Sequence, residues 1–245
     1  MSAFDRAAVR LLDAIWPRAC EAPGCGRRAD RPDSLLCSAC AAALPYASGA
    51  ACSKCGRTFP GQASADFVCD LCLKEKHPAF DRACHALEYI PPVDALVDIF
   101  KYRGGRWLAR DLAGFLEAAV RARLPFAEAD LIVPVPLHPE RMRRRGYNQA
   151  AELAGILGAG LGRAVRSDVL ARSRDTGHQA RLGRAERLAN VKGAFKAEKP
   201  EFVRGRAVIL VDDVMTTGAT LGECASALKA AGAAVVWAAT VAAAV

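Results

Sequence analysis

The pattern of apolar and polar positions predicts four strands of a parallel sheet. The clearest is residues 207–211, Ala-Val-Ile-Leu-Val, a β-branched run without polar alternation, as expected for a central strand buried on both faces. Similar runs occur at 83–89, 130–136 and 233–245, and the first of these is expected to pair at the sheet edge. Helical patterns separate the strands, so the sequence predicts an α/β domain with helices on the faces of a parallel sheet.

Apolar residues at helical spacing predict the helices between these strands. In residues 149–161, for example, Ala150, Leu153 and Leu157 share one face and are expected to pack inward. Gly232 is expected to stop the last helix. The predicted helices are residues 93–102, 108–123, 149–161 and 219–231.

Another helix is predicted at 4–16, where apolar residues share one face and Pro17 ends the pattern. Asp5 and Asp13 interrupt any apolar core of a signal peptide. The longest apolar run, 233–245, is too short to cross a membrane. We therefore expect a docking helix here, no membrane insertion and a cytoplasmic protein.

Eight of the ten cysteines form four closely spaced pairs. A gap of two residues lets a tight turn direct two thiolates at one ion, and two such turns complete a closed site of the kind that holds structural zinc. Disulfides would need an oxidising compartment, which the lack of a signal-peptide pattern argues against. Sequential pairing would give two successive zinc ribbons and alternating pairing a crossed arrangement, and the spacing leaves both open. The predicted zinc ligands are Cys20, Cys25, Cys37, Cys40, Cys52, Cys55, Cys69 and Cys72.

The cysteine pairs divide the chain and change the meaning of its charge. We expect an N-terminal helix and double zinc ribbon in residues 1–78 and the α/β domain in 79–245, with Cys84 and Cys224 as buried core thiols. The formal net charge of +8 counts neutral thiols. Two four-thiolate zinc sites would each carry about −2 and lower the total to about +4. This modest excess does not by itself indicate nucleic-acid binding, so the location of the charges must decide.

Two adjacent carboxylates and a hydroxyl-rich turn follow the strand at 207–211. Asp212 and Asp213 are hydrogen-bond acceptors at neutral pH and suit the vicinal hydroxyls of a ribose and, through these or through water, a magnesium ion. The turn opens a helix, whose free N–H groups and positive dipole end favour a phosphate. An ordinary capped turn would explain one carboxylate and one threonine but not the whole stretch. The candidate binding residues of the turn are Val214, Met215, Thr216, Thr217, Gly218, Ala219 and Thr220.

The stretch 208–221 resembles, position by position, the phosphoribosyl pyrophosphate signature of type I phosphoribosyltransferases. A phosphoacceptor receiver domain also carries an acidic pair after a strand. In that fold the pair follows the first strand, with most of the domain still to come, whereas here one helix and one strand remain. The topology therefore favours the sugar-phosphate site.

Basic residues gather in two other stretches. The loop 134–148 follows the strand at 130–136 and is expected to open on the same sheet edge as Asp212. The stretch 172–195 mixes basic and small polar residues and is expected to form a mobile lid that leads into a helix. Guanidinium groups bind phosphate oxygens in bidentate fashion, and a lid excludes water. For a single member such as Arg143, a solvated helix face is the alternative.

Together these features resemble the ComF-type competence proteins over residues 8–245. The resemblance implies a phosphoribosyltransferase-like domain behind a zinc-ribbon module, in proteins associated with natural transformation and the cytoplasmic handling of incoming single-stranded DNA. It also implies contacts with DNA-uptake and recombination proteins. The motifs that carry the resemblance are the double zinc ribbon, Pro134-Val-Pro-Leu, Arg145-Gly-Tyr-Asn-Gln149, Arg174-Asp-Thr with Gln179, Arg187 with Asn190, Gly193-Ala-Phe195 and the Asp212-Asp213 signature.

Two hypotheses follow. In the first, the protein is a phosphoribosyltransferase in which Asp212 and Asp213 hold the ribose and stabilise its positive charge. Arg145 and residues of the segment 172–187 would cover the pyrophosphate, with Lys101 as a weaker candidate for the same task. In the second, it is a non-catalytic DNA-processing adaptor that binds a phosphoribose or a DNA end. Binding of single strands also needs aromatic side chains for base stacking, and the basic stretches have few of them nearby. The other candidate substrate-binding residues are Pro134, Asn148, Gln149, Arg174, Gln179 and Arg187.

Overall fold

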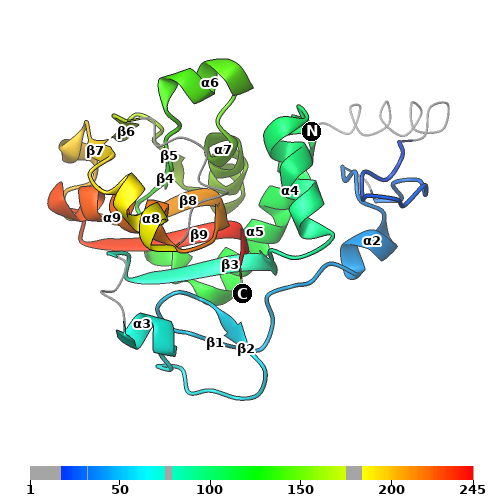
Figure 1. The fold of residues 1–245 in the computed structure, drawn as a ribbon, viewed down its shortest axis with the longest axis horizontal. Coiled ribbons are helices and arrows are strands. Elements are labelled where there is room, and N and C mark those ends of the chain that lie inside the picture. The colour runs from blue at the N-terminus through cyan, green and yellow to red at the C-terminus, as the bar shows by residue number, and fades with distance from the viewer. Residues whose placement is uncertain (1–17, 32, 75–78, 175–183, 245) are drawn as a thin grey trace.

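The computed structural model describes residues 18–31, 33–74, 79–174 and 184–244. The helix predicted at 4–16 lies outside these residues. All four predicted strands are confirmed, and they form a five-stranded parallel sheet with a short fifth strand (Figure 1). The order across the sheet is β3 (Arg82–Glu88), β9 (Val235–Ala243), β8 (Ala207–Met215), β4 (Leu131–Pro134) and β5 (Ala164–Val165), which leaves β3 at an edge as predicted.

Helices cover both faces of the sheet. Alternate residues of β8 face opposite layers: Ile209 and Val211 belong to the core beneath α4, α5 and α7, whereas Val208 and Leu210 belong to the core beneath α9. The predicted helices are confirmed to within one residue. Their bounds are α4 (Val93–Tyr102), α5 (Ala109–Arg123), α7 (Gln149–Leu161) and α9 (Ala219–Ala230).

Two predicted segments differ from the structure. The loop 134–148 contains a short helix, α6 (Pro139–Arg145), and the stretch 172–195 has paired strands at both ends, while residues 175–183 of the predicted lid lie outside the described residues. The latter begins and ends in strands β6 (Leu170–Arg172) and β7 (Phe195–Ala197), which pair in an antiparallel ribbon, with α8 (Arg184–Val191) between them. The helix at the end of the stretch is therefore confirmed, but both flanks are fixed by strand pairing.

The cysteine-rich region forms two lobes at different places on the α/β domain (Figure 1). The first lobe, residues 18–45 with helix α2 (Ser38–Ala42), packs against α5, where Asp111 accepts hydrogen bonds from Ser34 Oγ (2.5 Å) and from the backbone N–H of Leu35 (2.8 Å). The second lobe, residues 50–74, lies against the edge strand β3. Its elements are β1 (Ala50–Ala51), β2 (Thr58–Phe59) and α3 (Asp70–Lys74).

Gly56 lies where the second lobe contacts β3, and we expect Gly56→Ala to destabilise the protein by about 2 kcal/mol. Its φ is +74°, and an added Cβ would lie 2.5 Å from the backbone oxygen of Ala83. Gly61→Ala is the matched control, because Gly61 also has a positive φ (+96°) but open space around it. Urea unfolding of both variants measures the difference, and equal midpoints would contradict the close contact.

Candidate functional site

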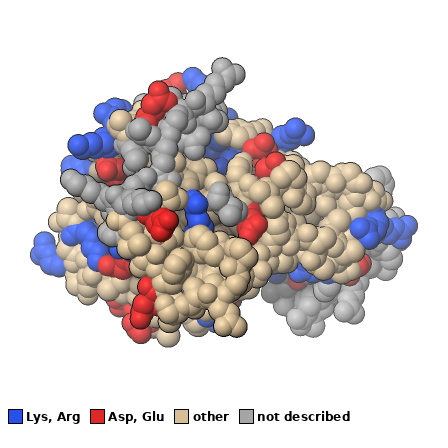
Figure 2. Space-filling model, turned by 60° about the horizontal axis from the view of Figure 1, so that its bottom comes forward, with Lys and Arg blue, Asp and Glu red and all other residues tan. Residues whose placement is uncertain are grey.

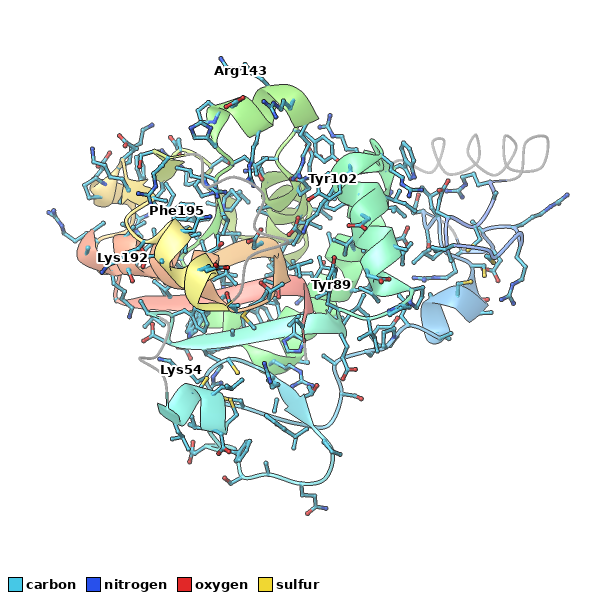
Figure 3. The ribbon with its side chains drawn as sticks, in the orientation of Figure 1. Lys54, Tyr89, Tyr102, Arg143, Lys192 and Phe195 are labelled. Carbon is cyan, nitrogen blue, oxygen red and sulfur yellow. The ribbon has the colours of Figure 1, made fainter. Side chains whose placement is uncertain are left out.

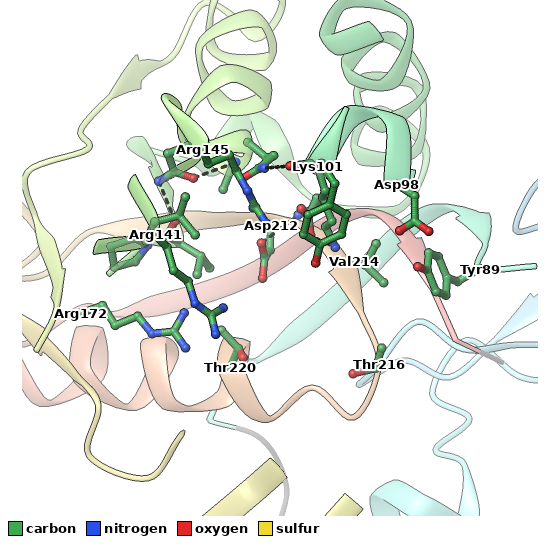
Figure 4. A pocket seen from close by; sticks show the side chains of 18 residues that line it. Tyr89, Asp98, Lys101, Arg141, Arg145, Arg172, Asp212, Val214, Thr216 and Thr220 are labelled. Atoms are coloured by element: carbon green, nitrogen blue, oxygen red, sulfur yellow. Dashed lines mark hydrogen bonds and ion pairs between the residues drawn. The ribbon is translucent and has the colours of Figure 1, made fainter. Parts of the chain in front are cut away.

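A pocket of about 760 Å³ lies at the carboxyl ends of β4 and β8 (Figure 4). This is the edge at which open parallel sheets bind ligands. Helix α4, the start of α7 and the segment that contains α6 complete its walls. Its lining residues are Tyr89, Asp98, Lys101, Tyr102, Val135, Pro136, Leu137, Arg141, Arg145, Asn148, Gln149, Ala150, Arg172, Asp212, Asp213, Val214, Thr216 and Thr220.

The two predicted aspartates lie within β8 and not after it. The prediction ended this strand at residue 211, but Asp212, Val214 and Met215 keep pairing with β9. Successive side chains of a strand project to opposite faces, so the two carboxylates approach the pocket from different sides. Asp213 faces α4, where Lys101 Nζ lies 2.9 Å from its Oδ1.

The pocket perturbs the titration of its charged groups. Burial and then the neighbouring charge of Asp213 raise the pKa of Asp212 to about 7. Burial alone would lower the pKa of Lys101, but the charge and hydrogen bond of Asp213 outweigh it and raise that pKa. Lys101 is therefore a stable cation, whereas Asp212 gains or loses its proton near neutral pH.

We expect Asp212→Asn to stabilise the ligand-free protein more at pH 8.5 than at pH 5.5. Because the pKa of Asp212 is raised by folding, the folded state holds the proton more tightly, and this carboxyl makes the protein less stable as pH rises from about 4 through about 7. Asparagine removes that penalty, so the melting temperature should rise by about 3–5 °C at pH 8.5. The exposed Asp66→Asn is the control, and a pH-independent shift in Asp212→Asn would contradict the explanation.

The turn after β8 leads directly into helix α9. Gly218 adopts φ +75° at the start of α9, and Thr217 Oγ1 accepts a hydrogen bond from the Ala219 N–H (3.3 Å). Of the predicted residues of the turn, Val214, Thr216 and Thr220 line the pocket. Met215 and Ala219 are buried beneath it in the core and support the turn instead.

Arginines form the opposite side of the pocket (Figure 4). Arg141 and the predicted Arg145 come from α6, and the Arg145 guanidinium lies 5.0 Å from the ring centroid of Tyr102. Arg172, which the sequence placed in a lid, is buried on β6 because its strand pairs with Phe195. Arg143 is exposed and points away from the pocket, which agrees with the solvated alternative (Figure 3).

The remaining candidates divide into three groups. Asn148 and Gln149 line the pocket; Asn148 caps α7 and donates to the Val135 carbonyl (3.0 Å), and Gln149 donates to the Lys101 carbonyl (3.4 Å). Pro134 is buried in β4 and is not a lining residue, since the wall begins at Val135. The other three residues lie in the basic stretch that follows β6, namely Arg174, Gln179 and Arg187.

Among the described residues of the stretch 172–195, Arg172 is the one that lines the pocket. Arg174 is exposed and donates to the carbonyls of Asn190 and Lys192 (both 2.9 Å), so it closes the base of the stretch and does not reach the pocket. Gln179 lies outside the described residues, and Arg187 lies in α8.

The polar lining residues Tyr89, Asp98 and Tyr102 lie outside the two basic stretches and the acidic signature, and the sequence reasoning did not assign them to the site. Asp98, Lys101 and Tyr102 stand at i, i+3 and i+4 of α4 and so share one helix face. That spacing beside the predicted Lys101 was the signal that could have identified two of them.

The cysteines form two separate four-sulfur groups, each with all its sulfur atoms within 4.8 Å of one another. Cys20, Cys25, Cys37 and Cys40 make one group and Cys52, Cys55, Cys69 and Cys72 the other. This is the sequential pairing, and both groups fit structural zinc ions because four convergent thiolates leave no open coordination position. Cys84 and Cys224 are buried apart from them, as predicted.

At the first site, hydrogen bonds favour the thiolate form of Cys25, whereas burial raises the pKa of Cys20 and the hydrogen bond with Cys25 raises that of Cys40. The backbone N–H and then the guanidinium of Arg27 lower the pKa of the Cys25 thiol to about 6, and the thiolate is the form that binds zinc. Within the described residues, no helix is both long enough and apolar enough to cross a membrane.

Two family models match this chain. Residues 11–73 match a double zinc ribbon domain, and residues 143–244 match a phosphoribosyl transferase domain. The second match includes Arg145 and both aspartates of the pocket.

Curated relatives match most of the chain. Competence protein F of Haemophilus influenzae is 37% identical over 207 residues, which is 80% of this chain and 85% of that protein. The DNA utilization protein YhgH of Salmonella typhimurium is 37% identical over 204 residues, 82% of this chain and 87% of that protein. Among solved structures, the glutamine phosphoribosylpyrophosphate amidotransferase from B. subtilis is 24% identical with a TM-score of 0.35, over 53% of this chain and 25% of the other.

Proposed function

This chain belongs to the ComF-type family of competence and DNA-utilization proteins, and we propose that it binds phosphoribosyl pyrophosphate with magnesium and acts as a phosphoribosyltransferase. The observation that carries the proposal is the arrangement of charge in the pocket. Arginines line one side, the aspartates of β8 stand in the middle, and the hydroxyl-rich start of α9 forms the floor (Figure 4). Phosphoribosyl pyrophosphate has two anionic ends joined by a sugar with vicinal hydroxyls, so its charges complement this order.

Each part of the ligand has a counterpart. The 5′-phosphate would accept hydrogen bonds from Thr216, Thr220 and the free backbone N–H groups at the start of α9. The ribose hydroxyls would donate to the carboxylates of Asp212 and Asp213. The pyrophosphate, with its magnesium ion, would lie toward the arginines of α6 and β6, which suit bidentate contacts.

The same residues would favour the reaction. As pyrophosphate leaves, the ribose ring gains positive charge, which the acidic pair stabilises, while arginines and Lys101 stabilise the departing anion. Lys101 neutralises Asp213 in the free protein and has three donors, so its ammonium can also contact an anionic ligand. A nucleophilic acceptor then forms the new bond to the ribose carbon that the pyrophosphate has left.

Calorimetric titration with phosphoribosyl pyrophosphate and magnesium tests the proposal. We expect binding to wild-type protein and to Asp66→Asn, and loss of binding in Asp212→Asn/Asp213→Asn, which keeps the shape and removes both charges. Absence of binding to the wild-type protein, or equal binding to the double variant, would refute the sugar-phosphate site.

A second function has its own observation. Tyr102 and Trp107 are 58% and 50% exposed, on either side of the turn after α4, and Arg145 lies against the ring of Tyr102. Aromatic rings beside cationic groups are the elements that bind single-stranded nucleic acids. We therefore propose, as the alternative, a DNA-processing adaptor in the cytoplasm that binds a strand of incoming DNA at this mouth and passes it to uptake or recombination proteins.

The distribution of surface charge limits DNA binding by such an adaptor to a short contact at the mouth of the pocket. On the part of the face in Figure 2 that the described residues form, basic side chains stand in separate groups with acidic ones among them, so there is no continuous basic track. Fluorescence titration with a short thymidine oligonucleotide over a series of salt concentrations measures the phosphate contacts. Binding that weakens steeply with salt and is lost in Tyr102→Ala/Trp107→Ala supports the adaptor, and no binding at low salt excludes direct DNA contact.

A further inference from the structure

A row of three polar side chains crosses the sheet behind the pocket. Asp212 of β8 is in register with Thr240 of β9, which is in register with His85 of β3. Register partners in neighbouring parallel strands project from the same face, so the three side chains stand next to one another. Two residues earlier in each strand, the same face carries Leu210, Ala238 and Ala83, all of them in the apolar core.

Two members of the row, the central Thr240 and the outer His85, are buried without full hydrogen bonding. Thr240 is 1% exposed and His85 is 3% exposed. Within the described part of the chain, Thr240 Oγ1 and His85 Nδ1 have no hydrogen-bond partner. A buried polar atom without a partner lowers the stability of the folded state, and apolar residues of similar size would avoid this loss. Packing alone therefore gives no reason for a hydroxyl and an imidazole at these positions.

The chemistry of the row provides a reason. Burial, followed by the positive charges of Arg123 and Arg57, lowers the pKa of His85 to about 4, so its imidazole is neutral and carries one N–H. A threonine hydroxyl both accepts and donates. The row can therefore form a directed chain in which the His85 N–H donates to Thr240 Oγ1 and the Thr240 O–H donates to the carboxylate of Asp212.

We propose that Thr240, held by His85, is a positioning residue that orients the Asp212 carboxylate for the ligand. In the free protein the hydrogen bond to Asp212 Oδ1 comes from the adjacent backbone N–H of Asp213 (2.9 Å). When ribose hydroxyls engage the carboxylate from the pocket side, the Thr240 hydroxyl binds it from the sheet side, so that the carboxylate is held between them. This inference rests on the proposed function, since it assigns a supporting residue to the same site.

The test compares Thr240→Val, which removes the hydroxyl but keeps the shape, with Thr240→Ser, which keeps the hydroxyl. The affinity for phosphoribosyl pyrophosphate with magnesium is measured by calorimetry, and stability by urea unfolding without ligand. We expect Thr240→Val to bind about 5- to 10-fold more weakly than wild type and to have an equal or higher urea midpoint. Thr240→Ser should restore most of the affinity, and His85→Leu should weaken binding by a smaller factor because it acts through Thr240.

Thr58→Val is the matched control. Thr58 is also buried, at 7% exposed, but its hydroxyl donates to Glu88 Oε1 (3.3 Å) away from the pocket. We expect this variant to lose stability and to keep its affinity, the reverse of Thr240→Val. The positioning role would be overturned by equal affinity of Thr240→Val and wild type, or by a lower urea midpoint for Thr240→Val, and either result would leave the proposed function intact. Wild-type protein that binds no phosphoribosyl pyrophosphate would overturn both the positioning role and the proposed function.

Discussion

Replacing Cys37 by serine is expected to lower the melting temperature of the whole protein by about 10 °C or more, and Cys52→Ser to lower it by less than half as much. Cys37 and Cys52 are both 2% exposed and belong to equivalent four-sulfur groups. They differ in what surrounds them. Cys37 belongs to the core that α4, α5 and α7 build against the sheet, whereas Cys52 belongs to a small cluster of its own.

The contacts of the first lobe explain the difference. Leu36 is fully buried in the shared core, and the buried carboxylate of Asp111 in α5 accepts hydrogen bonds from the preceding two residues of the lobe. Loss of zinc there exposes part of that core and breaks bonds to α5. A loss of about 3–5 kcal/mol corresponds to 10 °C or more for a protein of this size. The second lobe contacts mainly β3, so its loss leaves the helix layer intact.

Scanning calorimetry and circular dichroism of the two variants, each with its zinc content measured, check this prediction. Cys52→Ser should bind one zinc ion fewer and retain the spectrum of the α/β domain, which is what we expect if that domain has its own source of stability. Equal melting temperatures for the two variants would show that the lobes are equally independent of the sheet. Loss of the sheet signal in Cys52→Ser would show that the α/β domain depends on the second lobe as well.

Local signals in the sequence were sufficient for most of the helices and strands. Helix α7 was predicted to the residue because its buried positions recur at helical spacing, and in the structure Asn148 caps its first turn. Helix α6 was missed because it buries no residue and has no apolar period. Its signals were of another kind: His138 accepts from the Glu140 N–H, Pro139 occupies the first turn, and Gly146 ends the helix in the left-handed conformation.

Tertiary pairing decided what the sequence left open. Strand β8 runs past the predicted end because β9 continues beside it, and nothing within residues 212–215 alone shows that partner. Arg172 was expected on a lid for the same reason, since its partner Phe195 is 23 residues away in sequence. The cysteine pairing was open because both orders satisfy the spacing. In contrast, the acidic pair could be identified from sequence because the apolar run before it and the hydroxyl-rich turn after it are local signals, and Arg145 because it belongs to the basic loop 134–148.

Asp213→Asn is expected to destabilise the free protein by about 3 kcal/mol, even though it removes a residue that we assign to ligand binding. Its carboxylate forms the ion pair with Lys101, and the two side chains are only 11% and 19% exposed. Asparagine would leave a largely buried ammonium with its charge uncompensated by its partner. The exposed pair Arg144–Glu140 is the control, and Glu140→Gln should change stability by less than about 1 kcal/mol.

A double-mutant cycle separates the structural role of this pair from its role in binding. Lys101→Met/Asp213→Asn should recover most of the stability that Asp213→Asn loses, because the buried charge is removed together with its partner. Urea unfolding at pH 7 measures the four free energies, and strictly additive losses would refute the coupling between Lys101 and Asp213. If the double variant is stable and still fails to bind phosphoribosyl pyrophosphate, then the buried ion pair cannot be needed for the fold. The Lys101–Asp213 pair would then serve ligand binding and not the stability of the fold.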